Sequence, residues 1–440
     1  MMKRSGAFAL TLVLACLLLC SCTSVIDLSN VTSDYRSGHF DGAREMYESQ
    51  KSSIISTQGE IVYNLDYGML SMMSGDLKAS NLCLDAAETA IADGYTKSIT
   101  QNIGSYLMND NAIEYAGEDY EDIYINIFKA LNYYSLGSAE DAMVELRRSA
   151  EKQSRLQSRY DQQYSQVKDY VDSNDYSVSV QHFDYDFSTS ALSSYLMMTM
   201  SRSMKDYNTF EVARKQVTQA FATQSSLYDF SLPSFLSSET YDMDSGTARL
   251  NIIAFSGLAP IKEQREEYVD MPNGDIGKLA YPVLVSRGSS VRSVKISVDG
   301  KNPVPLELIE NLDSIVRDTF QPKQQLAISK TILRSYLKNA ATQVYDNVAK
   351  DKDTNETLSM IFQILGSITR LTNVISEQAD VRCSHFLPSK AWATGITLKP
   401  GKHAVSMMFC DSLGRILGQS DFEVEVREGE TNLIESVSAN

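Results

Sequence analysis

The chain has 440 residues, of which 43% are hydrophobic and 22% are charged, and its formal net charge is −16. This length suggests two or three domains, and the balance of apolar and charged residues is typical of a globular protein, not a disordered one. The acidic balance argues against nucleic acid as a partner, because phosphate binding needs a basic surface. It also argues against general adsorption to anionic lipid.

The first 22 residues have the layout of an export signal. Lys3 and Arg4 precede an apolar run over residues 7–19, which is too short to span a bilayer comfortably and is typical of a signal-peptide core. The next residues resemble a bacterial lipobox, in which a small residue, here Ser21, directly precedes the modified cysteine, here Cys22. The alternative is an ordinary secretory signal with incidental cysteines.

The lipobox interpretation divides the N-terminus into a signal peptide over residues 1–21 and a lipid-anchored tether over residues 22–30. Several acyl chains on Cys22 would hold the protein stably at a membrane, because each buried CH2 group contributes about 0.8 kcal/mol. Thr23 follows the cysteine in place of Asp. We therefore expect a cell-envelope protein, with the periplasmic face of the outer membrane favoured.

A pair of amphipathic helices is predicted over residues 119–150. Tyr124, Phe128 and Leu131 recur at helical spacing, so one stripe of the first helix is apolar. Gly137 then breaks the pattern before small and apolar residues restart it. A pair this short cannot bury its own apolar face, so we expect it to stack on similar units.

Similar patterns around Gly38 and Gly75 predict two earlier helix pairs, and residues 191–220 predict a fourth that lacks the turn glycine. The first two turn glycines are 37 residues apart, near the period of about 34 that is typical of tetratricopeptide-like repeats. The interval to Gly137 is longer, so we interpret residues 94–118 as an insertion between repeats.

The period changes to two from about residue 248, which indicates strands, and Asp299-Gly300 is a hairpin signal. Helical periodicity returns over residues 322–348 and 356–375 before strands resume at about residue 381. The fold class is therefore α+β multidomain, with N-terminal all-α repeats and a C-terminal β-sandwich-like domain. The expected boundaries are a repeat domain over 31–228, a linker over 229–247, and the sandwich-like domain over 248–440 with a helical hairpin inserted at about 308–377.

Several stretches together resemble a family of bacterial lipoproteins with tetratricopeptide-like repeats and no established activity. The resemblance covers most of the mature chain and implies the lipid anchor and the helical repeats, but no reaction. It also implies a hydroxyl residue at the position of Cys383, so any thiol function would lie outside the family pattern. The matching stretches are YNLDYGMLSMMSGD (Tyr63–Asp76), MNDNAIEYAGEDYE (Met108–Glu121), KALNYYSLGSAEDAMVELRR (Lys129–Arg148), ADVRCSHFLP (Ala379–Pro388) and LKPGKHAV (Leu398–Val405).

The insertion motif is the strongest candidate for a binding site, because side-chain acceptors there lie beside aromatic residues. Such a site would bind an extended peptide or a basic partner segment. The structural alternative is that Asp119 or Glu118 caps the following helix and that the Asn and Asp residues form local turns. The candidate binding residues are Asn109, Asp110, Asn111, Glu114, Tyr115, Glu118, Asp119 and Tyr120, with Arg147 and Arg148 as ion-pair partners of the acidic loop.

Two other groups carry weaker signals. Cys383 and Cys410 fall on predicted strands of one sandwich and could form a disulfide, with buried thiols as the alternative. A basic row on one face of the predicted helix over 322–348 could meet phospholipid headgroups or an acidic partner, with a solvated face as the alternative. The row consists of Lys323, Lys330, Arg334 and Lys338.

No catalytic motif, nucleotide-binding loop or zinc spacing is present in the sequence, so we expect neither an enzyme nor a cofactor or metal. The sequence favours a non-enzymatic, membrane-anchored scaffold that binds a protein partner in the bacterial cell envelope. The alternative is a lipoprotein that binds a peptide, glycan or small molecule and takes part in envelope or peptidoglycan maintenance.

Overall fold

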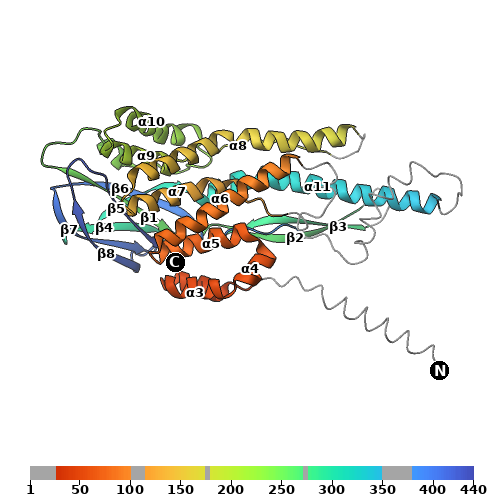
Figure 1. The fold of residues 1–440 in the computed structure, drawn as a ribbon, viewed down its shortest axis with the longest axis horizontal. Coiled ribbons are helices and arrows are strands. Elements are labelled where there is room, and N and C mark those ends of the chain that lie inside the picture. The colour runs from red at the N-terminus through yellow and green to blue at the C-terminus, as the bar shows by residue number, and fades with distance from the viewer. Residues whose placement is uncertain (1–25, 101–113, 174–178, 271–275, 349–378) are drawn as a thin grey trace, which may run out of the picture.

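The computed structural model describes five stretches of the chain (Figure 1). Cys22 with the signal peptide, residues 109–111 of the insertion motif and the second helix expected in the helical insertion fall outside them. The predictions that concern those residues therefore lie outside the described part of the chain. The described stretches are residues 26–100, 114–173, 179–270, 276–348 and 379–440.

Helices in the N-terminal half of the chain pack as consecutive pairs, with one short helix, α4 (Lys51–Gln58), between the first pair and the second (Figure 1). The four predicted helix pairs are therefore present, including the one that lacks a turn glycine. The pairs are α2 (Ser29–Arg36) with α3 (Phe40–Ser49), α5 (Glu60–Met73) with α6 (Leu77–Thr100), α7 (Asp119–Ser135) with α8 (Ala139–Ser173), and α9 (Ala191–Ser203) with α10 (Tyr207–Thr223).

The same turn joins the two helices of every pair. Gly38, Gly75 and Gly137 have φ angles of 79°, 80° and 86°, which glycine adopts without strain. In the second turn, the amide of Gly75 donates to the carbonyl of Met72 at 3.0 Å, and the amide of Asp76 donates to the carbonyl of Ser71 at 2.9 Å. This is the Schellman arrangement that ends helices.

The fourth turn keeps this arrangement without glycine. Lys205 takes the left-handed conformation, with a φ of 57°, and its amide donates to the carbonyl of Arg202 at 3.2 Å. The amide of Asp206 donates to the carbonyl of Ser201 at 3.0 Å. The Asp206 side chain then accepts from the amide of Thr209 at 3.0 Å and caps α10. The fourth turn therefore combines a strained residue, Lys205, with a side chain that caps the next helix.

Each helix pair packs on the next, because α3 contacts α5, α6 contacts α7 and α8 contacts α9. The first helices of the last three pairs are buried along nearly their whole length, and in α7 every residue from Tyr120 to Asn132 is buried. A helix that is buried on all sides needs neighbours on all sides. The second helices cover one side of these helices, and the sheet covers the other.

The insertion between the second and third pairs is shorter than predicted. Residues 94–100 were expected to belong to the insertion, but they continue helix α6. Gly94 does not break the helix there, but it allows a close approach, because a Cβ atom at this position would lie 3.2 Å from the Cα of Ala116. Helix α8 runs on to Ser173, well beyond the predicted end of the third pair at residue 150.

In place of two facing sheets, the C-terminal half forms one seven-stranded sheet that nearly closes on itself. Neighbouring strands are antiparallel except for β1 and β9, which are parallel. The edge strands β8 and β9 approach each other, and the hydroxyls of Ser420 and Ser436 lie 2.7 Å apart. The order is β8-β7-β4-β5-β6-β1-β9, with β1 (Ala248–Ser256), β4 (Ser293–Val298), β5 (Val304–Asn311), β6 (Lys390–Leu398), β7 (Gly401–Cys410), β8 (Ile416–Val426) and β9 (Asn432–Ser438).

A projecting arm extends from this sheet. It contains a separate antiparallel pair, β2 (Ile261–Asp270) and β3 (Ile276–Val285), and the long helix α11 (Leu312–Val348), which packs on β3 (Figure 1). Helix α11 lies between β5 and β6 in the chain, so the start of the predicted helical insertion is confirmed. Its predicted second helix lies outside the described residues.

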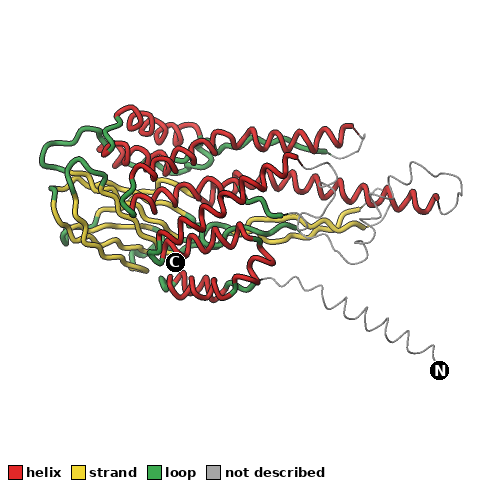
Figure 2. Tube along the Cα trace, in the orientation of Figure 1, coloured by secondary structure: helices red, strands yellow, loops and turns green. Residues whose placement is uncertain are grey.

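Two apolar cores hold the molecule together, and Figure 2 shows the strands flanked by the helices. The inner face of the curled sheet encloses one core, which includes Leu250 and Ile252. The outer face contributes Ile253 and Phe255 to a second core that continues through all four helix pairs. The residues expected to form a linker join this second core through η3 (Ser234–Ser238). No helix in the described part of the chain has the length and apolarity needed to cross a bilayer.

Candidate functional site

Residues 379–389, here called the 379–389 segment, pass between the helices and the arm as a mostly buried connection. Phe386 is fully buried, and its ring centroid lies 5.2 Å from that of Tyr35 and 5.8 Å from that of Tyr47. A buried segment without regular structure needs partners for its backbone polar groups. Two carboxylates, one from each of two helices, supply partners here.

Asp66 is the first of these carboxylates. It is fully buried on α5 and accepts a hydrogen bond from the Ser384 hydroxyl at 2.7 Å and one from the His385 amide at 2.8 Å. The Nδ1 atom of His385 lies 2.9 Å from the other carboxylate oxygen, and the Tyr47 hydroxyl donates to that oxygen at 3.1 Å. One side chain thus fixes residues more than 300 positions away in the sequence.

Glu121 is the second carboxylate, and it lies in the first turn of α7. It accepts from the Ser384 amide at 2.6 Å, the Tyr115 hydroxyl at 2.7 Å and the Glu118 amide at 2.9 Å. Burial, followed by the nearby charge of Glu118, raises the pKa of Glu121 to about 7. Its bond to the Glu118 amide is one half of a capping box, so the structural alternative for Glu118 is confirmed.

Glu118 also joins the arm to the helices. Its carboxylate pairs with Lys262 of β2 at 2.6 Å and with Lys323 of α11 at 3.5 Å, and Asp119 pairs with Lys323 at 3.1 Å. Burial opposes the charge of Glu118, but Lys262 and Lys323 outweigh it and lower the pKa of the carboxyl. Lys323, expected on a solvated or headgroup-facing row, is instead used inside the protein.

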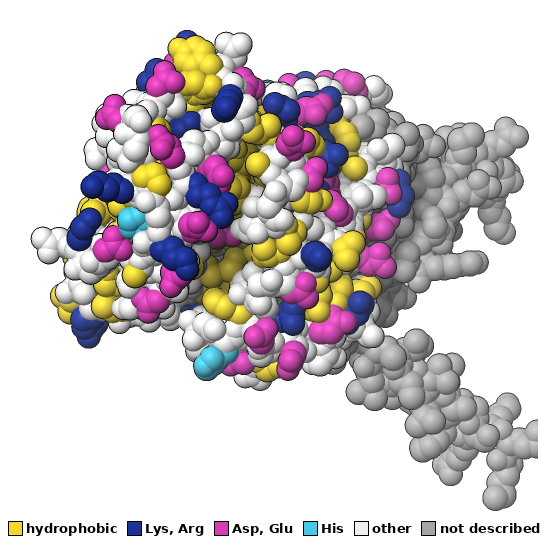
Figure 3. Space-filling view, turned by 60° about the vertical axis from the view of Figure 1, so that its left-hand side comes forward, with side chains coloured by type: hydrophobic (Ala, Val, Ile, Leu, Met, Phe, Trp, Pro, Cys, Tyr) yellow, Lys and Arg dark blue, Asp and Glu magenta, His cyan; other side chains and the backbone are white. Residues whose placement is uncertain are grey.

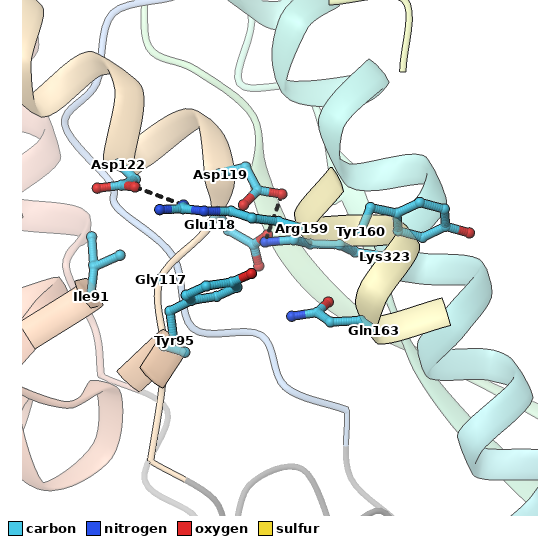
Figure 4. Close-up of a pocket in the computed structure, with 11 residues that line it drawn as sticks. Ile91, Tyr95, Gly117, Glu118, Asp119, Asp122, Arg159, Tyr160, Gln163 and Lys323 are labelled. Carbon is cyan, nitrogen blue, oxygen red and sulfur yellow. Dashed lines mark hydrogen bonds and ion pairs between the residues drawn. The ribbon is translucent and has the colours of Figure 1, made fainter. Parts of the chain in front are cut away.

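A small cavity of about 70 Å³ lies beside these pairs, where α7, α8 and α11 meet (Figure 4). Arg159 reaches across it to Asp122 at 3.0 Å and lies over the ring of Tyr95, with 4.6 Å between the guanidinium carbon and the ring centroid. A space of this size admits a few water molecules, and it is smaller than the cavity of about 150 Å³ that holds benzene. Because the charges that line it are already paired, the cavity is a filled junction and not a ready ligand site.

The predicted insertion motif is only partly assembled at this junction. Glu118 and Asp119 line the cavity, whereas Tyr115 and Tyr120 are buried in the core. Glu114 is exposed and pairs with Lys97 at 2.9 Å. Asn109, Asp110 and Asn111 lie outside the described residues.

Arg148 does not pair with the described part of the acidic loop. Arg148 pairs with Glu145 on its own helix at 2.9 Å, and Arg147 is exposed there. Helix α8 returns along α7, so the cations of α8 that reach the start of α7 lie further along that helix. They are Lys152 and Arg159, which lie 2.5 Å and 3.0 Å from the carboxylate of Asp122.

The predicted disulfide does not form, and the alternative of buried thiols describes the structure. Cys383 and Cys410 are both free and buried. Cys410 ends β7, opposite Ser293 of β4, whereas Cys383 lies in the 379–389 segment, where its sulfur accepts from the Lys262 amide at 3.4 Å. The two thiols therefore belong to different parts of the molecule. Burial raises the pKa of Cys383 to about 12, which makes this thiol unreactive.

The sequence analysis missed a third buried carboxylate, Glu310, on the outer face of β5. It accepts from the Ser190 hydroxyl at 2.8 Å, the Tyr228 hydroxyl at 2.9 Å and the Leu192 amide at 3.0 Å, and the Tyr124 hydroxyl also donates to it. The strand register shifts between Leu308 and Glu310. The available signal was an acid directly after the apolar pair Leu308-Ile309.

The buried carboxylates of this region each meet donors from elsewhere in the same chain, so their arrangement holds segments together. Within the described residues, no group of three or more His, Cys, Asp or Glu side chains is placed to hold a metal ion. Comparisons of the chain with protein-family models, with curated proteins and with solved structures found no match.

Proposed function

We propose that this chain is a lipid-anchored, non-enzymatic scaffold of the bacterial cell envelope, which binds a protein partner through its tetratricopeptide-like helix pairs. The stacked pairs support this proposal, because units of this kind present long surfaces that suit protein partners. The mixed surface supports it too. In the view of Figure 3, acidic and basic side chains are interspersed, so that face has no basic field of the kind nucleic acid needs.

The anchor would hold the folded body close to the membrane. Only three residues separate Cys22 from Ile26, which already packs against the helical core, and Leu28 is buried. At about 3.5 Å per residue, a tether of this length reaches roughly 14 Å. A partner would therefore be another envelope component within reach of the membrane surface.

The partner would dock on the second helices of the pairs. The first helices α5, α7 and α9 are covered by the chain itself, through Asp66 to the 379–389 segment, through Phe128 to Phe255 of β1, and through the Tyr195 hydroxyl to the Thr394 carbonyl. Their surface is therefore not available to another protein without opening the core.

An exposed apolar residue recurs at one position of the second helices, and this observation carries the proposal. Leu82, Val144 and Val212 each lie seven residues after the left-handed turn residue of their pair. They are 72%, 42% and 55% exposed. Single apolar residues on a surface are normal, but their recurrence at the same position of three units indicates a shared contact.

Site-directed photo-crosslinking in native cells tests the docking surface. A photoreactive residue is placed in turn at Leu82, Val144 and Val212, and at Val304 of β5 as a matched apolar control that is 41% exposed. We expect the three helix positions to capture the same protein and the Val304 position not to capture it. Equal capture from Val304 would contradict the proposal.

Charge substitution gives an independent check. The triple variant Leu82→Glu, Val144→Glu, Val212→Glu changes exposed positions only, so its unfolding temperature should remain near that of the unchanged protein. We expect the captured partner to stop co-purifying with it. If the partner is retained at the original level, these helices are not the docking surface. Mass spectrometry of the native N-terminus tests the anchor separately, with an acylated Cys22 as the expected result.

A further inference from the structure

A second cavity, of about 220 Å³, lies where the end of α7 meets the two edge strands of the curled sheet. Strands β8 and β9 do not pair with each other there, so the curled sheet does not close into a complete barrel. The end of α7 covers only part of the gap between the two strands. Its lining is mostly apolar and aromatic. It consists of Leu131, Tyr134 and Ser135 from α7, Phe422 from β8, and Leu433, Ile434 and Glu435 from β9.

Among the described residues, Glu435 is the only charged one in this lining. Side chains alternate along a strand, and in β9 Leu433 and Val437 pack against the helical core, whereas Ile434 packs against the inner core of the sheet. Glu435 shares a face with Leu433 and Val437. Its carboxyl therefore points from the sheet toward the helices, into the region that the cavity occupies.

Glu435 is half-buried, and its carboxyl group lacks the donors that the fully buried carboxylates have. Its Oε2 atom is buried and has no hydrogen-bond partner, whereas Asp66, Glu121 and Glu310 each accept at least three hydrogen bonds. Burial alone raises the pKa of Glu435 to about 7. A buried carboxylate without a donor or a cation is costly, and a ligand that brings both removes that cost.

The hydroxyl of Tyr134, another polar group of the lining, is already used. The Tyr134 hydroxyl donates to the Thr431 carbonyl at 2.8 Å and accepts from the Leu433 amide at 3.0 Å. Tyr134 therefore offers only its ring to a ligand, and Phe422 contributes a second ring. The cavity combines apolar and aromatic walls with a single acid that can fix the orientation of a ligand, which is the usual composition of a small-molecule site.

We propose that this cavity binds a small primary amine with an apolar body. The ammonium group pairs with Glu435 and donates to its free oxygen, while the body lies against Leu131 and the rings of Tyr134 and Phe422. A divalent metal ion fits less well, because hard cations need several oxygen ligands and the lining supplies one carboxylate. A cavity of about 150 Å³ holds benzene, so this one has room for a phenyl ring with a short aminoalkyl chain.

Calorimetric titration of the full-length protein with 2-phenylethylamine tests this proposal. The neutral alcohol 2-phenylethanol has nearly the same shape and serves as the ligand control. At pH 8, where Glu435 and the amine are both charged, we expect the amine to bind ~10-fold or more tightly than the alcohol, because a charge-assisted hydrogen bond is lost in the alcohol.

Two variants locate the binding. Glu435→Gln should abolish the preference for the amine over the alcohol, whereas Glu423→Gln, which changes an exposed acid of β8 paired with Lys402, should leave it unchanged. Ser135→Trp changes an exposed residue of the lining and should exclude both ligands by filling the cavity. It also keeps the test decisive if the Glu435 variant fails to fold.

Three outcomes would overturn the proposal. They are a lack of amine binding at millimolar concentration, an amine preference that survives Glu435→Gln, and amine binding that survives Ser135→Trp. Binding of the amine and the alcohol with equal affinity would show an apolar cavity without the charge recognition proposed here. None of these results depends on whether a protein partner docks on the second helices, so the two proposals stand or fall separately.

Discussion

Single carboxylates connect parts of this chain that are far apart in the sequence. Asp66 and Glu121 hold the 379–389 segment, and Glu310 holds the start of α9. Removing a carboxylate from water is costly, and only several donors placed together offset that cost. Each of these residues therefore specifies one arrangement of its partners, since a shifted segment would leave an unpaired buried charge.

The substitution Asp66→Asn should lower the free energy of unfolding by about 3 kcal/mol, because one buried group loses its charge and part of four contacts. Urea unfolding followed by circular dichroism measures this change. Asp41→Asn is the matched control, since Asp41 is exposed on α3 and its only ion pair, with Arg44, is 3.9 Å long. If the two substitutions lower the free energy of unfolding equally, the buried contacts of Asp66 do not stabilise the protein as proposed.

Glu121 should make stability fall as pH rises. Its pKa is raised from 4.5 to about 7 in the folded protein, so the folded state binds this proton more tightly than the unfolded chain does. The resulting stabilisation is fully present below about pH 4.5 and is lost as pH rises through about 7. The whole difference corresponds to about 3 kcal/mol.

The urea midpoint measured from pH 5 to pH 8 tests this sign. We expect it to fall less steeply in Glu121→Gln than in the unchanged protein, whereas Glu114→Gln, at an exposed position, should keep the original slope. Other buried carboxyls, such as Glu435, also titrate in this range, so the difference between slopes is the relevant quantity. Parallel curves for the protein and Glu121→Gln would refute the assignment.

At the scale of elements, a conformational rule explains why the helix pairs could be predicted. The turn needs a residue with positive φ, and glycine at three of the four turns marks that need in the sequence. Strand β2 was missed for the opposite reason. Residues 262–267 of β2 read KEQREE, and a strand that is polar on both faces has no alternation to detect.

Lys205→Gly should stabilise the protein by about 1 kcal/mol, because a residue with a Cβ atom is strained in the left-handed region and glycine is not. Gly137→Lys should have the reverse effect at the equivalent turn. A Cβ atom at Gly137 would meet nothing within 4 Å, so the backbone conformation alone causes the loss. Thermal unfolding measures both variants, and shifts of the same sign would contradict a shared turn geometry.

At the scale of the molecule, the sequence separates the helical half from the strand-rich half but does not show how they are joined. Each buried face was predicted from its periodicity, yet periodicity does not identify what covers that face. The first helices of the pairs could have faced a partner, but α7 and α9 face the sheet of their own chain and α5 faces the 379–389 segment. The same limit applies to the candidate site. The sequence marks Glu118 and Asp119 as unusual but cannot show that Lys262 and Lys323 neutralise them.

The residues between the helices and the sheet also act as part of the core. Glu239 is fully buried and accepts from Arg249 at 2.9 Å and from Asn251 at 3.0 Å, and Arg202 of α9 pairs with it as well. A Cβ atom at Gly395 of β6 would lie 2.2 Å from its carboxylate, so glycine is needed there. The helices and the sheet therefore share one buried junction.

A cut in the backbone should consequently leave the molecule in one piece. A specific protease site inserted after Ser245, in an exposed turn, allows the folded chain to be nicked between its helical and sheet halves. We expect both fragments to elute together in size-exclusion chromatography and to unfold in a single transition, because separating them would expose the shared core, leave Glu310 without donors, and deprive Asp66 and Glu239 of part of theirs. An uncleaved sample with the same insertion is the control. If the fragments separate without denaturant, the two halves are independent domains, and the first helices would then be free to bind a partner.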